Sequence, residues 1–92
     1  LNRLALELQV KPHIINLLKN KNLNNLVIDY NSASNGIILN ILFEGFISQK
    51  ISYSETKKNI SNLKNNFNLK LNKHSIYWSL IGIFRGLKNK IA

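Results

Sequence analysis

The sequence predicts a small all-α protein whose last two helices form a helix-turn-helix-like pair. Its 92 residues are enough for one domain. Ile60, Leu63 and Phe67 recur at the spacing of one helix face, and a second stretch with the same period lies near the C-terminus. Ser52 and Glu55 precede the first stretch with the spacing of a capping box, a pattern typical of helix starts.

Residues 1–25 are predicted to form an N-terminal arm or docking segment ahead of a helical domain over residues 26–92. The first ten residues fit a strand, because apolar positions alternate, and equally a helix, because apolar residues recur on one side. Pro12 favours the first turn of a short helix over residues 11–20, where a missing backbone N–H is tolerated. An asparagine-rich run is expected to end that helix.

The middle of the chain combines a β-prone run with a strongly apolar helix. Residues 26–30, LVIDY, are rich in residue types that favour strands. Serine and asparagine residues able to cap a helix follow them, and the segment from Asn35 or Gly36 to Ser48 is apolar on almost every side. This pattern predicts a central buried helix that is too short to span a membrane.

The capping box predicts that a short basic helix begins near Ser54. Along it the three periodic apolar residues face inward, while Lys57, Lys58 and Lys64 are expected to point to solvent. These lysines fit a solvated helix face and a phosphate-contacting face equally well.

The last helix is predicted to start after Asn72, with Asn72 as its N-cap and with Leu71 and Ile76 forming a hydrophobic staple. Its inward stripe is expected to consist of apolar residues at helical spacing, namely Ile76, Leu80, Ile83, Phe84 and Leu87.

A second face of the same helix carries only small residues, which are Ser75, Ser79, Gly82 and Gly86. Each glycine inside a helix costs about 0.5–1 kcal/mol relative to alanine, so a close contact is expected to offset that cost. A neighbouring helix is the preferred interpretation, and a nucleic-acid backbone is the alternative.

The composition argues against several classes of function. The chain has no cysteine, two histidines and four carboxylates, which are too few for a convincing metal cage. Phosphate loops, nucleophile elbows and paired catalytic carboxylates are absent from the sequence, and His13 and His74 fit surface or capping positions. We therefore expect no catalysis, no metal, no cofactor and no small-molecule ligand, and a cytoplasmic protein without membrane association.

The charge of the chain is distributed unevenly. Residues 1–45 carry four cations and three anions, whereas residues 46–92 carry nine cations and one anion, so almost all of the net +9 lies in the second half. Such an asymmetry favours a polyanionic partner, most often nucleic acid.

The basic helices outline a helix-turn-helix, in which the first helix lies on the DNA backbone and the second enters a groove. The candidate DNA contacts are therefore the polar and basic residues of this pair: Lys57, Lys58, Lys73, His74, Ser75, Tyr77, Arg85 and Lys88. The candidate oligomer interface comprises Trp78, Gly82 and Gly86.

From residue 26 to residue 91 the chain has an apolar run, a serine-rich turn, an apolar helix, a short helix opening at a serine and a final helix. That final helix carries the step Tyr77-Trp78-Ser79 before an apolar stripe that includes Arg85. This order resembles the PapB-type regulators of fimbrial adhesin operons. The resemblance implies an all-helical, oligomeric protein that contacts the minor groove of AT-rich DNA, with Lys57, Lys58, Tyr77 and Arg85 as contacts.

These features together predict an oligomeric transcriptional regulator of the bacterial nucleoid that binds AT-rich double-stranded DNA. It is expected to assemble through its N-terminal arm or through the small-residue face of its last helix. A protein-binding module without nucleic-acid contact is the main rival, followed by an RNA-binding protein. A membrane-surface role for the last helix is least favoured, because its cations cluster near its ends.

Overall fold

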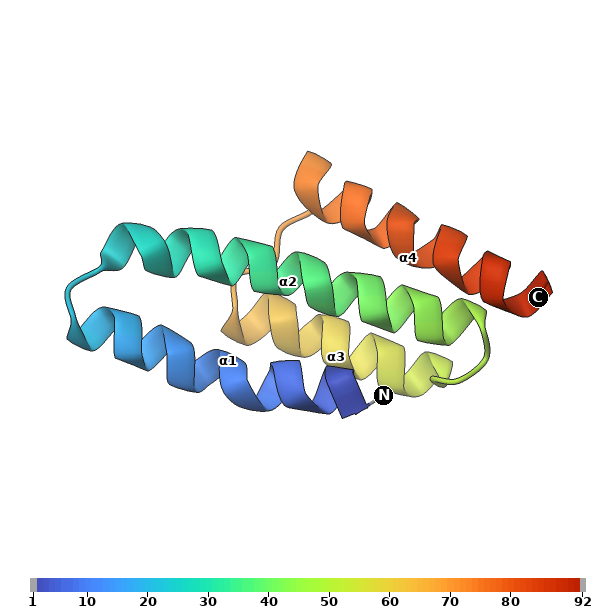
Figure 1. Ribbon diagram of the computed structural model, residues 1–92, viewed down its shortest axis with the longest axis horizontal. Coiled ribbons are helices and arrows are strands. Elements are labelled where there is room, and N and C mark those ends of the chain that lie inside the picture. The colour runs from blue at the N-terminus through green and yellow to red at the C-terminus, as the bar shows by residue number, and fades with distance from the viewer. Residues whose placement is uncertain (1, 92) are drawn as a thin grey trace.

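The computed structural model describes residues 2–91, which form four helices: α1 (Asn2–Asn20), α2 (Asn24–Ile47), α3 (Tyr53–Asn66) and α4 (Lys73–Ile91). The central element is α2, and each of the other helices packs on it (Figure 1). In Figure 1, α1 and α3 run antiparallel to α2, whereas α4 runs in the same direction as α2. The predicted all-α class is confirmed. None of the helices in residues 2–91 combines the length and the hydropathy that crossing a membrane requires.

The core lies where α2 meets α1, α3 and the link between α2 and α3. Its buried apolar residues are Leu4, Ile38, Leu39, Leu42, Ile51 and Leu63. Leu63 is completely inaccessible, and Ile60 and Phe67 pack against the same cluster, so the predicted inward face of α3 is confirmed. Burying a large aliphatic side chain contributes about 1.5–3 kcal/mol, which makes this cluster the main source of stability.

The N-terminal segment is one continuous helix, so the open choice between strand and helix is resolved as helix. Pro12 lies inside α1 and not in the first turn of a short helix, which corrects the predicted helix start. A proline inside a helix costs about 3 kcal/mol because it removes a hydrogen bond and crowds the preceding turn. The packing of Leu4, Leu8 and other residues of α1 along α2 offsets this local cost.

The second helix begins at Asn24, well before the predicted start at Asn35 or Gly36, so almost half of its 24 residues precede the expected helix. Residues 26–30 are helical, and their β-prone composition is overridden by packing against α1. The expected boundary between residues 25 and 26 therefore falls inside α2. With Leu4 in the core, α1 is an integral part of the fold, which corrects its prediction as a separate arm.

Two of the helix ends are closed by residues in the left-handed backbone conformation. Asn22 has φ 57° and Gln49 has φ 64°. In both turns the following N–H reaches back five residues, from Leu23 to the carbonyl of Leu18 and from Lys50 to that of Gly45. This is the Schellman arrangement. Asparagine tolerates the left-handed region better than most residues, which explains physically why the asparagine-rich run ends α1.

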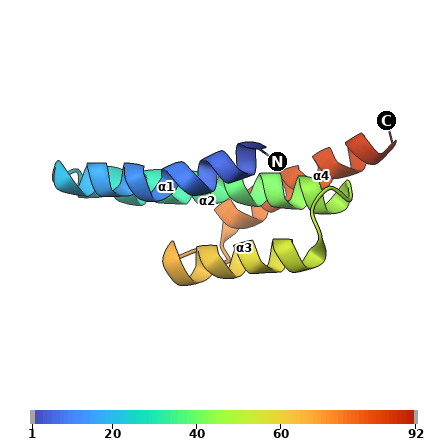
Figure 2. The same cartoon turned by 90° about the horizontal axis from the view of Figure 1, so that it is seen from below.

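The two C-terminal helices do not form a compact helix-turn-helix, which corrects the predicted pairing. Both α3 and α4 pack on α2, and their backbones do not approach one another. Figure 2 shows α3 on one side of the layer that α1 and α2 form. The link from Phe67 to Asn72 spans the space between them, so the pair lacks the short turn that holds a recognition helix against its partner.

The buried face of α4 is its small-residue face. Ser75, Gly82 and Gly86 are buried, and a side-chain carbon at position 82 would lie 2.5 Å from the carbonyl oxygen of Asn40 on α2. Most of the predicted inward stripe is instead exposed: Ile76, Leu80, Phe84 and Leu87, with Ile83 partly buried. The preferred interpretation of the glycines, a neighbouring helix, is confirmed, and the predicted inward stripe is wrong. The backbones of α2 and α4 approach so closely that only the small-residue face of α4 fits between them.

A lysine is buried within the bundle. Lys11 is completely inaccessible, and its Nζ donates a hydrogen bond to the carbonyl oxygen of Asn31 at 3.1 Å. The same Nζ lies 4.9 Å from the centre of the Phe67 ring. Burial lowers the pKa of Lys11 from 10.5 to about 8, and the neighbouring Glu7 carboxylate partly opposes this shift.

Candidate nucleic-acid interface

The basic half of the chain presents all of its cations to solvent. The nine exposed residues are Lys50, Lys57, Lys58, Lys64, Lys70, Lys73, Arg85, Lys88 and Lys90. Glu55 is the one carboxylate in residues 46–92, so this half of the sequence has a net charge of +8. A surface with this imbalance attracts polyanions over distances of the order of the Debye length.

The cap at Ser52 positions the lysines of α3. Its hydroxyl accepts a hydrogen bond from the backbone N–H of Glu55 at 3.1 Å, so α3 begins one residue earlier than predicted, at Tyr53. With the buried face of α3 turned toward α2, Lys57 and Lys58 are both exposed. Their predicted solvent exposure is confirmed.

The start of α4 is held by reciprocal hydrogen bonds between Asn72 and Ser75. The Asn72 side-chain oxygen accepts from the Ser75 N–H at 2.9 Å, and the Ser75 hydroxyl oxygen accepts from the Asn72 N–H at 3.0 Å. This confirms Asn72 as the N-cap. Leu71 is 89% exposed, so the predicted staple with Ile76 buries little surface. Ser75 is buried in this cap, which corrects its assignment as a DNA contact.

Replacing Asn72 by alanine is expected to cost about 1 kcal/mol of unfolding free energy, because the N–H of Ser75 loses its partner. Urea denaturation followed by circular dichroism measures the change. Asn65→Ala, an exposed substitution on α3, is the matched control and should shift the free energy by less than about 0.5 kcal/mol. Equal effects of the two substitutions would contradict the capping role.

The histidine and aromatic residues of α4 form a small cluster over α2. The Nε2 of His74 lies 3.1 Å from the carbonyl oxygen of Ser32, and the His74 ring meets Trp78 edge-on at 6.3 Å between ring centres. The ring of Tyr77 also meets Trp78 edge-on, at 5.8 Å between ring centres. Both His74 and Tyr77 stay exposed, so each remains accessible to a partner.

Trp78, Gly82 and Gly86 lie on the side of α4 that faces α2. Trp78 is half-buried, and its ring covers Gly36 so closely that a side-chain carbon there would lie 2.6 Å from Trp78 Cδ1. A carbon at position 86 would lie 2.6 Å from the Cβ of Ile47. These three residues therefore serve a contact within the chain, which corrects their assignment to an interface between copies.

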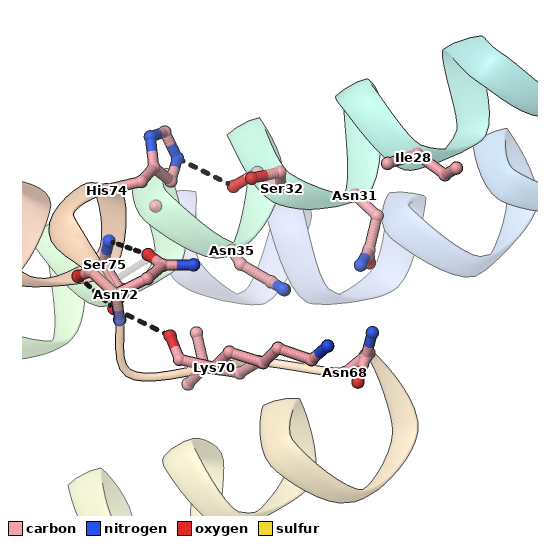
Figure 3. A pocket seen from close by; sticks show the side chains of 11 residues that line it. Ile28, Asn31, Ser32, Asn35, Asn68, Lys70, Asn72, His74 and Ser75 are labelled. Atoms are coloured by element: carbon pink, nitrogen blue, oxygen red, sulfur yellow. Dashed lines mark hydrogen bonds between the residues drawn. The ribbon is translucent and has the colours of Figure 1, made fainter.

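A polar cavity of about 180 Å³ lies between α2, the link and the start of α4 (Figure 3). Asn31 and Asn35 of α2 line it, and both amides donate to the carbonyl oxygen of Phe67, at 2.8 and 3.0 Å. On the other side, the Ser75 hydroxyl donates to the carbonyl oxygen of Lys70 at 2.8 Å. These bonds satisfy backbone groups of the link and so hold it in place. Within residues 2–91, no three histidine or carboxylate side chains are grouped as a metal site.

Two lysines of the basic half border the same groove in the structure. Lys64 of α3 and Lys70 of the link border a groove of about 240 Å³ between α3 and α4, over an apolar floor that includes Phe43 and Ile60. The sequence left Lys64 open between a solvated and a phosphate-contacting face, and it did not single out Lys70. From the sequence, Lys70 is recognisable only as one of the cations of the basic half. Its position beside Lys64 depends on the path of the link, which hydrogen bonds to α2 determine.

The predicted DNA contacts were assigned to two helices of one helix-turn-helix-like unit, and the structure does not pair these two helices. The helices α3 and α4, which carry those residues, both pack on α2 but make no close backbone contact with each other. Comparisons with known protein families, with characterised proteins and with solved structures find no match for this chain. The fold and the surface together define a small, basic, four-helix protein.

Proposed function

We propose that the protein binds AT-rich duplex DNA and regulates transcription by occupying its sites. The observation that supports this proposal is the exposure of all nine cations of residues 46–92, against a single carboxylate. Phosphate contacts by lysine and arginine supply most of the affinity of small DNA-binding proteins. The narrow minor groove of AT-rich DNA concentrates negative potential and so attracts these side chains most strongly.

The exposed lysines of α3 form the proposed phosphate-contacting surface. Lys57 and Lys64 lie two helical turns apart on one side of the helix, about 10 Å along its axis. Lys58 is also exposed on α3, and Lys70 of the link borders the same groove as Lys64. Flexible lysine side chains at this spacing can reach successive phosphates of one strand, a mode of binding that positions the protein without reading bases.

The double substitution of Lys57 and Lys58 by alanine is expected to weaken binding equally on all duplexes. Each lost phosphate contact lowers the slope of log K against log salt by about 0.9, so the slope should fall by about 1.8. Fluorescence anisotropy with AT-rich duplex, GC-rich duplex and structured RNA, at several salt concentrations, measures both quantities. The matched control is Lys19→Ala/Lys21→Ala, two exposed lysines of the other half, which should leave the slope unchanged.

Three results would contradict parts of this proposal. An unchanged salt slope in the Lys57/Lys58 double variant would remove these residues as phosphate contacts. Tighter binding of the structured RNA than of either duplex would replace DNA by RNA as the ligand. Absence of binding to every probe at about 100 mM salt would leave the basic surface as a solvated face.

A protein-binding module is the second candidate, supported by apolar residues at the turn between α1 and α2. Leu17, Leu23, Leu26 and Ile28 are all exposed there. Large apolar residues that stay exposed close together in the chain are candidates for contact with a partner. If no nucleic acid binds, Ile28→Glu should abolish the association with that partner while Lys57→Ala leaves it intact.

A further inference from the structure

The outward side of α4 carries a continuous apolar seam. Five residues form it, and they are exposed as follows: Tyr77 60%, Leu80 47%, Phe84 66%, Leu87 43% and Ile91 86%. Their spacing alternates three and four residues, which is the a/d pattern of a coiled-coil helix. We call these five residues the α4 seam.

The α4 seam is distinct from the contacts that hold α4 in the fold. The opposite side of the helix, with Gly82 and Gly86, packs on α2. Both routes of assembly that the sequence suggested, α1 and the small-residue face, are therefore occupied within the chain. The seam is left as the face of α4 that a second molecule can cover without displacing any helix.

The exposed area of this face suits a dimer. The seam together with Ile76 exposes about 700 Å², taking roughly 200 Å² for a fully exposed large side chain. A standard protein interface buries about 800 Å² on each partner. A contiguous apolar patch of this size exceeds what monomeric proteins commonly expose.

We propose that the α4 seam pairs with the α4 seam of a second copy, with the two helices antiparallel. In the antiparallel register a positions face d positions, so that Leu80 lies opposite Phe84 of the second copy and Tyr77 opposite Leu87 of the second copy. The pairing is self-complementary, as a two-fold dimer requires.

The charges of α4 select this direction. The helix has no acidic residue, and Arg85, Lys88 and Lys90 lie in its C-terminal third. A parallel pair would bring both sets of three cations together at one end, whereas an antiparallel pair places one set at each end. Antiparallel pairing also aligns the two helix dipoles favourably.

Sedimentation equilibrium of the full chain without nucleic acid tests the dimer. Wild type is expected at twice the chain mass of 10.6 kDa at micromolar concentration. Phe84→Glu and Leu80→Lys should each be monomeric with unchanged helix content by circular dichroism, because both side chains point outward. Leu71→Glu is the matched control: its position is 89% exposed but outside the seam, and it should remain dimeric.

The direction of pairing can be tested by disulfide crosslinking, since the chain has no cysteine of its own. A mixture of Tyr77→Cys and Leu87→Cys chains, one of them carrying a mass tag, should oxidise mainly to the mixed dimer. In a parallel pair each variant would crosslink to itself, because identical positions then lie opposite each other. Predominant self-crosslinking would overturn the antiparallel arrangement.

The dimer proposal and the DNA proposal can be tested separately, because salt affects the two processes in opposite directions. Dimerisation of like-charged chains strengthens with salt, whereas DNA binding weakens with salt. A monomeric wild type at all concentrations and salts would overturn the dimer. A dimer that persists in Phe84→Glu would also overturn the proposal. A third contrary result is a wild-type monomer that cosediments with anionic phospholipid vesicles, if Phe84→Glu abolishes this cosedimentation. In that last case the seam would cover a lipid surface.

Discussion

Replacing Gly82 by alanine is expected to destabilise the protein by about 2–3 kcal/mol, although the same change at an exposed helix position stabilises by about 0.5–1 kcal/mol. The new carbon would lie 2.5 Å from the carbonyl oxygen of Asn40 and 3.1 Å from its Cα. Both are backbone atoms in the middle of α2, so neither can turn away as a side chain could. The helices must separate, and contacts along their whole length weaken.

Urea denaturation of Gly82→Ala measures this effect directly. Lys88→Ala, an exposed substitution on the same helix, is the control and should change the unfolding free energy by less than about 0.5 kcal/mol. Gly86→Ala should behave like Gly82→Ala, because its new carbon would meet the carbonyl oxygen of Glu44 at 2.9 Å. If Gly82→Ala were as stable as the wild type, α4 would not pack on α2 through this face.

Replacing Lys11 by methionine is expected to stabilise the protein at pH 7 and to remove a pH dependence of the wild type. In the folded protein the pKa of Lys11 is about 8, whereas the unfolded chain has the ordinary value of 10.5. Below pH 8 the lysine is charged in both states, and the full cost of burying its charge is present. Methionine has a similar length and no charge, so it avoids that cost.

The sign of the wild-type pH dependence follows from the same two pKa values. Between pH 8 and 10.5 the folded protein loses the proton while the unfolded chain keeps it, so unfolding takes up a proton. Stability from this group therefore rises with pH across that interval, by about 3 kcal/mol in total, and levels off above it. The difference in stability between Lys11→Met and wild type should shrink correspondingly.

Unfolding free energies of both proteins at pH 7, 8, 9, 10 and 10.5 check this expectation. Taking the difference in unfolding free energy between the variant and wild type at each pH removes the contributions of the other titrating groups, which both proteins share. Lys19→Met, an exposed lysine of the same helix, should give a curve parallel to that of the wild type. Parallel curves for Lys11→Met and wild type would show that Lys11 is not buried in the folded state.

Local signals in the sequence predicted where the two C-terminal helices begin and which face of α3 is buried. Ser52 and Asn72 both act as N-caps, and Leu63 is buried as its helical spacing indicated. These features depend on atoms within a few residues of one another, so the sequence alone identifies them. Exposure of the lysines on α3 follows equally directly from the apolar stripe on the opposite side of that helix.

The extents of α1 and α2 depended on contacts between distant residues. Pro12 and the β-prone run 26–30 both disfavour a helix locally, yet both lie within helices. Propensities of this kind are worth a few kcal/mol at most, and the packing of two long helices side by side outweighs them. The burial of Lys11 has the same origin, because Asn31 and Phe67 reach it from other parts of the chain.

By itself the sequence determined that the protein is helical, where two helices begin and which half is basic. Only the tertiary structure decided which face of α4 is buried, and with it the location of the candidate interfaces. Periodicity marks the apolar face of a helix but does not say whether the same chain or another molecule covers it. Here two backbones approach so closely that only glycine and serine fit between them, so the small face packs on α2 and the apolar α4 seam remains exposed.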